Sequence, residues 1–583
     1  MTSAPPRTPH TSELRQAMTH LKGVFAGLGV FSFFVSLLML TGPLYMLQVY
    51  DRVLASGSIP TLVALTVMVL VLYAALGFLE WIRNSVFASV GSRLEDELAD
   101  RALSVSLNQS LADPGRRQTR ALQNLRVIRR FVASPALPAF FDAPWTPIFF
   151  IALFMMHWIF GAWAIFGALV LIGLTTINQA VSGKAIAAAE EGDRKAQSSA
   201  DELSQNVEVI DALGMRAALL GRWRTTLDEA DSASVRSARS GTAFTSGTKA
   251  FRLFLQSAML GLGAWLSIIG QSTPGAMIAA SIIMGRAIAP IEQCVGQWRS
   301  IVTARRSWMA LSAALDADEP ASERMRLNDI KGALAVEDLS AGPPRATRPF
   351  LKRLNFKLQP SQTLGVIGPS ASGKSTLSML LVGAWKPLGG TVRLDGADLS
   401  AWDPGELGPQ LGFLPQRVNL FSGTVRENIA RFQSDAKPEA VIEAAMAAGC
   451  HEMILQLHEA YDTEIGSGGA YLSAGQQQRI GLARALYGQP NFIVLDEPNA
   501  NLDSAGDEAL QQALLGLKRR VATTVIVSHR PAILSQCDCL LVLDQGEQRL
   551  FGPRQEVMNR LAELRQKAAG QVTPLRQQES AHG

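Results

Sequence analysis

The sequence predicts a two-part fold, in which an α-helical membrane domain with six spans precedes an α/β domain built around a phosphate-binding loop. Three features indicate this division. Apolar runs of membrane-spanning length occur only before residue 297. A glycine-rich loop follows a short apolar run at residues 368–376. The run Leu472–Gln476, Leu-Ser-Ala-Gly-Gln, precedes by about 20 residues an apolar segment that ends in Asp496 and Glu497.

The bulk composition agrees with a chain that is partly embedded in a membrane and partly water-exposed. Hydrophobic residues make up 48% of the 583 residues, charged residues make up 18%, and the mean hydropathy is +0.15. The net charge of +4, from 54 basic and 50 acidic side chains, is small and predicts no nucleic acid partner. The four cysteines form no Cys-x-x-Cys pair, which predicts free thiols in a reducing compartment.

Six apolar runs are long enough to cross a bilayer, because a helix needs about 20 such residues. They cover residues 23–47, 58–80, 137–157, 158–181, 251–270 and 275–296. Residues 143–183 contain no acidic or basic side chain over 41 positions, which predicts two helices joined by a tight turn near His157. Residues 1–20 are polar, and the run that follows is too long for a cleaved signal peptide, so we expect a retained first span.

Basic residues set the predicted orientation in the bilayer. Residues 82–135 carry nine arginines, and residues 182–250 carry nine lysines and arginines together. The connections on the opposite side contain only Arg52 as a basic residue. Because basic segments remain in the cytoplasm, both long segments, the soluble domain and both chain ends are predicted to be cytoplasmic.

The two long basic segments are amphipathic, which predicts membrane helices that continue well beyond the bilayer. Each segment has a break near its middle, at residues 112–115 and at residues 213–215. Two interpretations are open: plain helical hairpins, or hairpins whose tips form short helices that dock onto the soluble domain. The motifs described below favour the second interpretation.

Changes in composition give the remaining boundaries. Residues 21–314 form the predicted membrane domain, and the polar residues 315–332 form a linker. In residues 333–565, short β-type runs such as 363–367 alternate with helical patterns, which predicts an α/β domain with a largely parallel sheet. The polar tail, residues 566–583, is predicted to be disordered.

The glycine-rich loop matches the phosphate-loop pattern in full and lies between an apolar strand and a predicted helix over 376–381. Its glycines allow backbone N–H groups to close on phosphates, and the helix N-terminus favours negative charge. Lys374 is expected to reach the β- and γ-phosphates of ATP, and Ser375 is expected to bind Mg²⁺. The predicted nucleotide-binding residues are Gly368, Pro369, Ser370, Ala371, Ser372, Gly373, Lys374, Ser375 and Thr376.

Two adjacent carboxylates end a predicted strand, and we expect them to divide the chemistry of hydrolysis. Asp496 should hold Mg²⁺, and Glu497 should polarise the attacking water as the general base. Gln416 follows another strand and is a candidate ligand for Mg²⁺ or its water. It is also a candidate for connecting the soluble domain to the membrane domain. His529 follows a third strand and is a candidate catalytic residue.

In this order, the motifs resemble the nucleotide-binding domain of an ATP-binding cassette (ABC) transporter, an α/β P-loop NTPase fold. Six spans ahead of one cassette resemble an exporter half-transporter, so the resemblance implies two chains. It also implies that the Leu472–Gln476 signature binds the ATP held by the other chain, through Ser473, Gly475 and Gln476. Asp503 is expected to communicate between the two chains across the same interface.

The sequence departs from this family pattern at two positions. Ala474 stands where the signature usually has glycine, and alanine would cost about 1 kcal/mol if the position required a positive φ. The aromatic residue that usually stacks on adenine would fall near Pro343, where the sequence has none. Phe350 is a substitute candidate.

Three membrane-domain stretches resemble the type I secretion ATPases of the PrtD type, which export proteases and related proteins. They are residues 43–52, 141–147 and 284–292. The resemblance implies an inner-membrane homodimer that works with a periplasmic adaptor and an outer-membrane channel. Its cargo would be unfolded proteins with a C-terminal signal.

Charged residues at Asp142, Arg286 and Glu292 have two interpretations, either an aqueous polypeptide path or internal ion pairs. The runner-up function is an exporter of lipids or small amphiphiles. A third class, a non-transporting ATPase that regulates a membrane partner, is disfavoured because such a regulator needs no six-span pathway.

Overall fold

The computed structural model of the chain describes residues 14, 18–19, 21–113, 120–318, 330–344, 346 and 348–570. They fall into two compact units. The first unit comprises residues 1–108 and 118–319, and the second comprises residues 109–117 and 320–583, within the described ranges.

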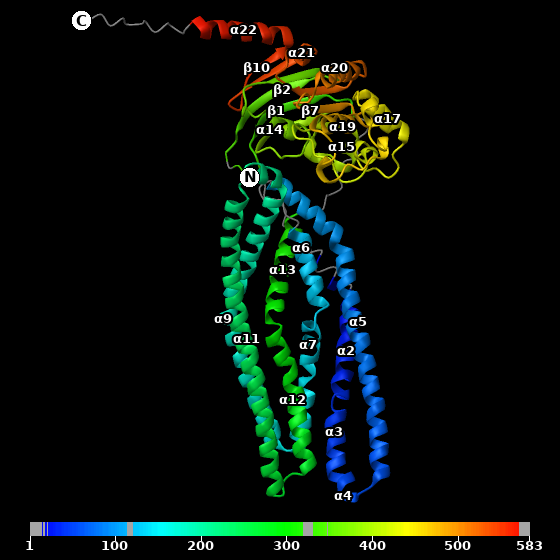
Figure 1. Ribbon diagram of the computed structural model, residues 1–583, viewed down its shortest axis with the longest axis vertical. Helices are drawn as coiled ribbons and strands as arrows, with labels where there is room; N and C mark the ends of the chain where they lie inside the picture. The colour runs from blue at the N-terminus through cyan, green and yellow to red at the C-terminus, as the bar shows by residue number, and fades with distance from the viewer. Residues whose placement is uncertain are drawn as a thin grey trace, which may run out of the picture. The chain divides into compact units, whose positions relative to one another are not determined.

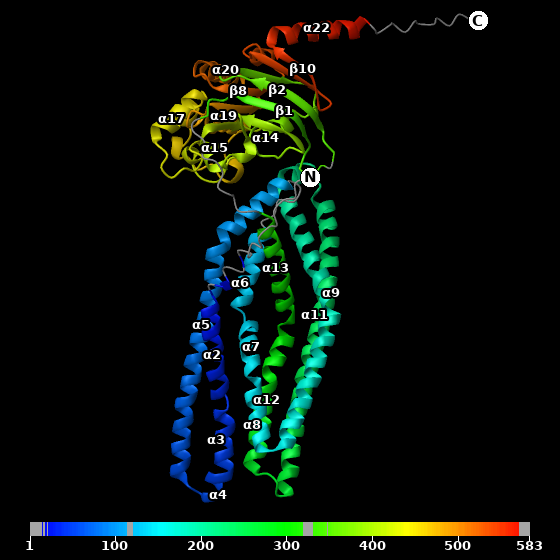
Figure 2. The same cartoon turned by 180° about the vertical axis from the view of Figure 1, so that it is seen from behind.

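The first unit is entirely helical in its described residues (Figures 1 and 2). Its helices are α2 (Lys22–Leu38), α3 (Thr41–Gln48), the π-helical turn η1 (Val49–Val53), α4 (Leu54–Ser56), α5 (Ile59–Ala112), α6 (Arg120–Val132), α7 (Ala136–Asp142), the 3₁₀ turn η3 (Ala143–Trp145), α8 (Thr146–Met156), α9 (Trp158–Gln205), α10 (Val207–Ala212), α11 (Arg216–Ile268), α12 (Pro274–Gly296) and α13 (Trp298–Ala317).

Within the described residues of this unit, six segments are long and apolar enough to cross a membrane, as predicted. They are Lys22–Ser56, Ile59–Ala112, Ala136–Met156, Trp158–Ile177, Arg216–Ile268 and Pro274–Gly296. Helices α5, α9 and α11 contain 54, 48 and 53 residues. At about 1.5 Å per residue they reach roughly 70–80 Å, more than twice the thickness of the hydrocarbon layer, a length that agrees with the predicted continuation beyond the bilayer. Helices α9 and α11 run side by side along their length (Figures 1 and 2).

The predicted breaks in this unit coincide with residues that leave helical geometry. His157 is extended (φ −169°, ψ 140°) between α8 and α9, and its Nδ1 accepts a hydrogen bond from the Ile159 N–H at 3.2 Å. Gly214 has φ +64° between α10 and α11, so the second tip carries a short helix. The predicted first tip lies mostly outside the described residues.

Two of the charged residues in the spans form ion pairs inside the unit. Asp142 of α7 accepts a hydrogen bond from Arg83 of α5 at 2.6 Å, and Arg83 also donates to Ser32 of α2 at 3.2 Å. Glu292 of α12 pairs with Arg252 of α11 at 3.0 Å. For these two carboxylates, the ion-pair interpretation is therefore correct.

The second unit is an α/β domain. Its strands are β1 (Leu334–Ala341), β2 (Leu351–Leu358), β3 (Thr363–Ile367), β4 (Gly389–Leu394), β5 (Ala397–Asp398), β6 (Leu411–Leu414), β7 (Phe492–Asp496), β8 (Thr523–Val527), β9 (Cys539–Asp544) and β10 (Glu547–Pro553). Its helices are α14 (Lys374–Leu381), α15 (Pro404–Gln410), α16 (Val425–Ile429), α17 (Pro438–Ala447), α18 (His451–Leu455), α19 (Ala474–Leu486), α20 (Ser504–Arg519), α21 (Pro531–Leu534) and α22 (Arg554–Gly570), with 3₁₀ turns η4 (Leu399–Ala401), η5 (Ala460–Asp462) and η6 (Ser467–Gly469).

The ten strands form one sheet in the order β5-β4-β1-β2-β10-β9-β3-β8-β7-β6. Strands β9, β3, β8, β7 and β6 are parallel, whereas β5, β4, β1 and β2 pair antiparallel, as do β10 and β9. The prediction of a largely parallel sheet is therefore right for the half that carries the phosphate loop. Short connections between consecutive strands, such as β4 and β5, produce the antiparallel half.

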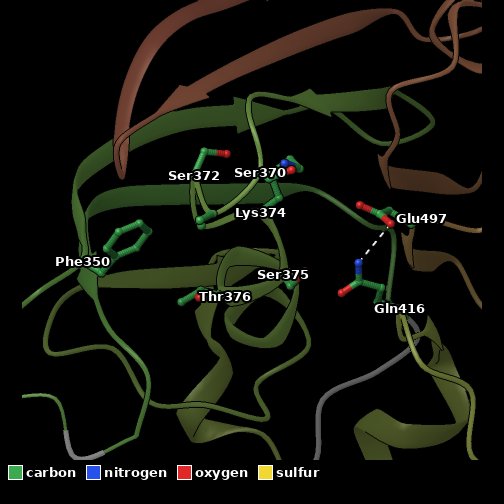
Figure 3. Close-up of a pocket in the computed structure, with 10 residues that line it drawn as sticks. Phe350, Ser370, Ser372, Lys374, Ser375, Thr376, Gln416 and Glu497 are labelled. Carbon is green, nitrogen blue, oxygen red and sulfur yellow. Dashed lines mark hydrogen bonds between the residues drawn. The ribbon is translucent and has the colours of Figure 1, made fainter. Parts of the chain in front are cut away.

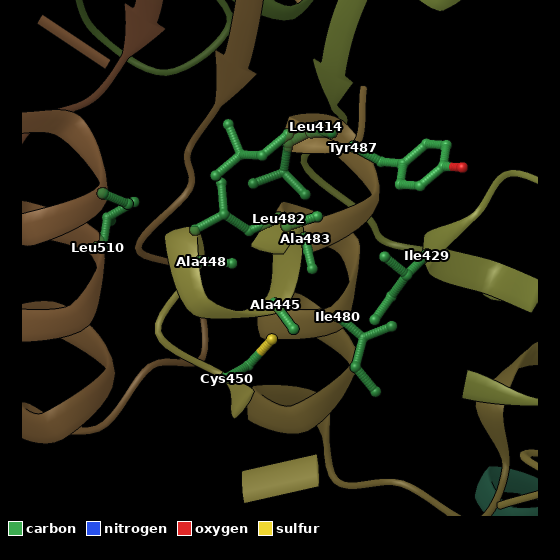
Figure 4. Packing of buried hydrophobic residues seen from close by; sticks show 14 of the residues in the cluster. Leu414, Ile429, Ala445, Ala448, Cys450, Ile480, Leu482, Ala483, Tyr487 and Leu510 are labelled. Atoms are coloured by element: carbon green, nitrogen blue, oxygen red, sulfur yellow. The ribbon is translucent and has the colours of Figure 1, made fainter. Parts of the chain in front are cut away.

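The two larger of three apolar clusters in the described residues of this unit lie around α14 and α19. One joins α14 to the sheet through residues such as Leu377 and Val494. The other surrounds α19, where Ile480 packs close to Ala445 and Cys450 (Figure 4). All four cysteines are free, as predicted.

Two predicted boundaries shift. Helix α13 continues to Ala317, three residues into the predicted linker, whose residues 319–329 lie outside the described ranges. Helix α22 continues to Gly570, five residues into the tail that was predicted to be disordered. The stretch 554–569 is rich in Ala, Leu, Glu, Arg and Gln, which are strong helix formers.

Candidate active site

The phosphate loop connects the buried strand β3 to the N-terminus of α14. Gly373 has φ +100° directly before the helix, a conformation that glycine adopts without strain. The loop borders a cavity of about 270 Å³ (Figure 3). The cavity is lined by Phe350, Ser370, Ala371, Ser372, Gly373, Lys374, Ser375, Thr376, Gln416 and Glu497. The sequence therefore predicted most of this lining.

Lys374 lies folded into the loop. Its Nζ donates hydrogen bonds to the carbonyl oxygens of Gly368 at 2.9 Å and Pro369 at 2.8 Å. Burial lowers the pKa of the Lys374 ammonium, while the negative charges of Glu497 and Asp496 oppose that shift. The loop thus holds the Lys374 side chain against its own backbone carbonyl groups.

Asp496 is the last residue of the fully buried strand β7, and only 2% of its surface is exposed. Burial raises its pKa to about 6; a hydrogen bond from Ser375 and the charge of Lys374 oppose the shift, and Glu497 adds to it. Within the described part of the chain, Asp496 Oδ1 has no hydrogen-bond partner. A buried carboxylate oxygen without a partner beside a serine hydroxyl fits a hard cation.

Glu497 turns the chain out of β7 with φ +50°, a conformation that is uncommon for residues other than glycine. Its Oε2 accepts a hydrogen bond from Gln416 Nε2 at 3.0 Å (Figure 3). Gln416 follows β6, which pairs with β7 in parallel, so the sheet brings the two side chains to one edge. His529 follows β8, is exposed, and does not line the described cavity.

Helix α19 begins at Ala474, inside the signature run Leu472–Gln476. Ser473 caps it: the Gln476 N–H donates to Ser473 Oγ at 3.3 Å, and the Ser473 N–H donates to Gln476 Oε1 at 2.9 Å. Ala474 is the first helical residue and has a negative φ, so the condition under which alanine would be costly is not met. No residue of the signature lines the described cavity.

Helix α19 holds the loop 498–503 at three points that the sequence did not reveal. Arg479 forms an ion pair with Asp503, which also caps α20 through the Gly506 N–H at 2.8 Å. Gln478 donates to the Pro498 carbonyl at 3.3 Å. A methyl group on Gly475 would lie 2.9 Å from the Asn501 carbonyl oxygen.

These contacts fix Asp503 at the base of α20. The Gly506 N–H, followed by the charge of Arg479, lowers the pKa of Asp503, so its carboxylate is ionised at neutral pH.

Phe350 lies at the start of β2 and is 38% exposed. Its ring lies on the opposite side of the phosphate loop from the Glu497–Gln416 pair (Figure 3). A methyl group added to Gly373 would lie 3.0 Å from a ring carbon of Phe350, so the ring lies close to the loop backbone. The structure thus places the substitute aromatic in the cavity lining.

Comparison with known proteins agrees with this geometry. Residues 351–500 match the family model described as ABC transporter, and residues 25–290 match the ABC transporter transmembrane region. The chain belongs to the ABC transporter family, is a multi-pass membrane protein, and couples ATP hydrolysis to transport.

Within that family, the chain is similar to type I secretion ATP-binding proteins. The type I secretion system ATP-binding protein PrsD of Rhizobium meliloti (strain 1021) is 42% identical, over 94% of each chain. The toxin RTX-I translocation ATP-binding protein of Actinobacillus pleuropneumoniae is 28% identical, over 93% of this chain and 77% of the relative. A solved bacterial Atm1-family ABC exporter with ATP bound has the same fold, with a TM-score of 0.83 and 21% identity over 96% of this chain and 99% of that chain.

Proposed function

We propose that the protein exports unfolded polypeptides across the bacterial inner membrane, as the ATP-driven component of a type I secretion system. The observation that carries this proposal is the 42% identity to PrsD over 94% of both chains, which includes the membrane unit. Likeness confined to the ATPase unit would support ATP use but would say nothing about cargo.

Hydrolysis in this proposal uses the groups gathered at the end of β7. Glu497 accepts the proton of the attacking water, and Gln416, 3.0 Å away, orients the Glu497 carboxylate. Lys374 and the loop N–H groups bind the phosphates. Ser375 and the unpartnered Oδ1 of Asp496 would hold Mg²⁺, which supplies charge neutralisation at the phosphates when bound. His529 would act only after a movement that brings it to the cavity.

The ATP site is proposed to be shared by two identical chains. Ser473, Gly475 and Gln476 lie outside the lining of the described cavity, yet the N-terminus of α19 offers N–H groups that suit a phosphate. The signature of one chain would therefore close on the ATP of its partner, and Asp503 would report across that interface.

The remaining parts of the proposal concern topology and partners. Both chain ends and the tips of the hairpins are cytoplasmic, because the basic residues concentrate there. Helix α10 is the proposed docking helix of the second tip. A periplasmic adaptor and an outer-membrane channel would continue the path to the outside. The alternative cargo is a lipid or small amphiphile.

Secretion by a strain that depends on this protein tests the proposal. We expect Lys374→Ala and Glu497→Gln to abolish the appearance of the secreted polypeptides in the culture medium. Glu497→Gln should also retain ATP in a closed dimer, because the general base is lost while binding persists. The matched controls Lys386→Ala and Glu508→Gln change exposed residues outside the cavity lining and should secrete normally.

Two results would contradict this account. Continued secretion by Lys374→Ala would show that export does not depend on this ATPase. Stimulation of ATP hydrolysis by lipid alone, with an unchanged set of secreted proteins, would favour the lipid or amphiphile exporter.

A further inference from the structure

Arg286 is an exposed charge near the middle of an apolar span. It lies 12 residues after the first residue of α12, which is about 18 Å along a helix that covers a hydrocarbon layer of about 30 Å. Its side chain is exposed, and no ion pair or hydrogen bond joins it to another described residue. An arginine at this depth is costly in lipid, so it faces either water or protein.

Among the described residues, no free carboxylate lies at this depth in the chain. Three acidic residues of the described spans are bound within the chain: Asp51 to Thr273 at 2.5 Å and to the Gly275 N–H at 2.8 Å, Asp142 to Arg83 at 2.6 Å, and Glu292 to Arg252 at 3.0 Å. Glu80, the first acidic residue of α5, lies 21 residues along that helix, which is about 31 Å from its start and beyond the middle of the layer.

The position of Arg286 on α12 separates it from the packed side of the helix. Ile283, Met284, Ala287 and Ile288 are buried against other helices of the unit. Gln293, two helical turns from Arg286 on the same face, is also exposed. An exposed arginine at mid-membrane depth, beside the packed side of the same helix, indicates a wet path next to it.

We propose that Arg286 binds carboxylate groups of the polypeptide as it passes through the membrane unit. This inference rests on the proposed polypeptide export. A lipid headgroup does not fit, because headgroups lie about 15 Å from the middle of the layer. An unfolded chain in the path can present aspartate and glutamate side chains at any depth. Arg286 would therefore favour acidic segments over neutral ones.

Peptide binding to the full-length protein in lipid nanodiscs tests this assignment. The probes are two fluorescent 20-residue peptides, one of alternating Asp and Gly and the other of alternating Asn and Gly. We expect the wild type to bind the acidic peptide about fivefold to tenfold more tightly, and Arg286→Gln to remove that difference. Arg286→Lys should keep part of it. Arg93→Gln, which removes an exposed charge of α5 outside the hydrocarbon layer, should keep all of it.

The outcomes separate the two proposals. Equal binding of both peptides by the wild type, or an unchanged preference in Arg286→Gln, overturns the role of Arg286 and leaves polypeptide export standing. Failure of the wild type to bind either peptide counts against both proposals. Dissociation of the dimer in Arg286→Gln, measured by mass, would place Arg286 in a contact between copies and overturn the inference.

Discussion

At the scale of single residues, the buried carboxylate of Asp496 lowers the stability of the folded protein, and it is also the group proposed to bind Mg²⁺. Its carboxylate is buried at the end of β7, and burial is the main reason that its pKa rises to about 6 from an ordinary value of 3.8. Between pH 4 and pH 6 the folded protein retains a proton that the unfolded chain has released. The free energy of unfolding therefore falls as the pH rises through that interval, and the full cost is present above pH 6.

Asp496→Asn should therefore stabilise the nucleotide-free protein in EDTA at pH 7.5, by at most about 3 kcal/mol, since one pKa unit corresponds to about 1.4 kcal/mol. This gain in the free energy of unfolding should shrink towards pH 4.5, where the wild-type carboxyl is already protonated. Thermal unfolding at both pH values measures this. The exposed Asp435→Asn serves as the control and should show no gain. A gain that is equal at both pH values would mean that the charge is not its source.

At the scale of elements, the start of α19 determines how the signature can act. Ala474 has ordinary helical geometry, whereas the close approach of Gly475 to the Asn501 carbonyl leaves no room for a methyl group. Helix α19 thereby positions the loop that follows Glu497, through Gln478 and the Arg479–Asp503 pair.

Two adjacent substitutions should therefore behave in opposite ways. Ala474→Gly should leave ATP hydrolysis within about twofold of wild type, because it relieves no strain. Gly475→Ala should lower the rate by about tenfold or more, because it displaces the 498–503 loop and with it the groups beside Glu497. Steady-state ATPase rates of the two purified variants measure this. A marked gain in Ala474→Gly, or an unaffected Gly475→Ala, would contradict this description of the signature.

The sequence revealed elements that depend on neighbouring residues and missed contacts that depend on packing. The phosphate loop, β3, β7 and the turn at His157 each have a local chemical cause, such as glycine in a tight loop or a run without charges. The Arg479–Asp503 pair joins α19 to a loop 24 residues away, and no local pattern predicts it. The placement of Phe350 in the cavity likewise depends on the pairing of β2 with β1 and β10.

At the scale of the whole molecule, the account requires two copies of the chain. Within one cassette, Ser473 and its neighbours in the signature do not line the cavity beside Lys374. Each ATP is proposed to lie between Lys374 of one chain and Ser473 of the other. In that case, two damaging substitutions leave a different number of intact ATP sites when they are on the same copy than when they are on different copies.

The ATPase rate of doubly tagged mixed dimers is the most direct test of this claim. In one dimer, one copy carries Lys374→Ala and its partner carries Ser473→Arg, so both lesions meet in one shared site and the other site stays intact. In the second dimer, one copy carries both changes beside a wild-type partner, so each site is damaged. The account predicts substantial hydrolysis by the first dimer and little by the second. Equal rates, or the reverse order, would contradict it, and the reverse order would show that each chain completes its own site.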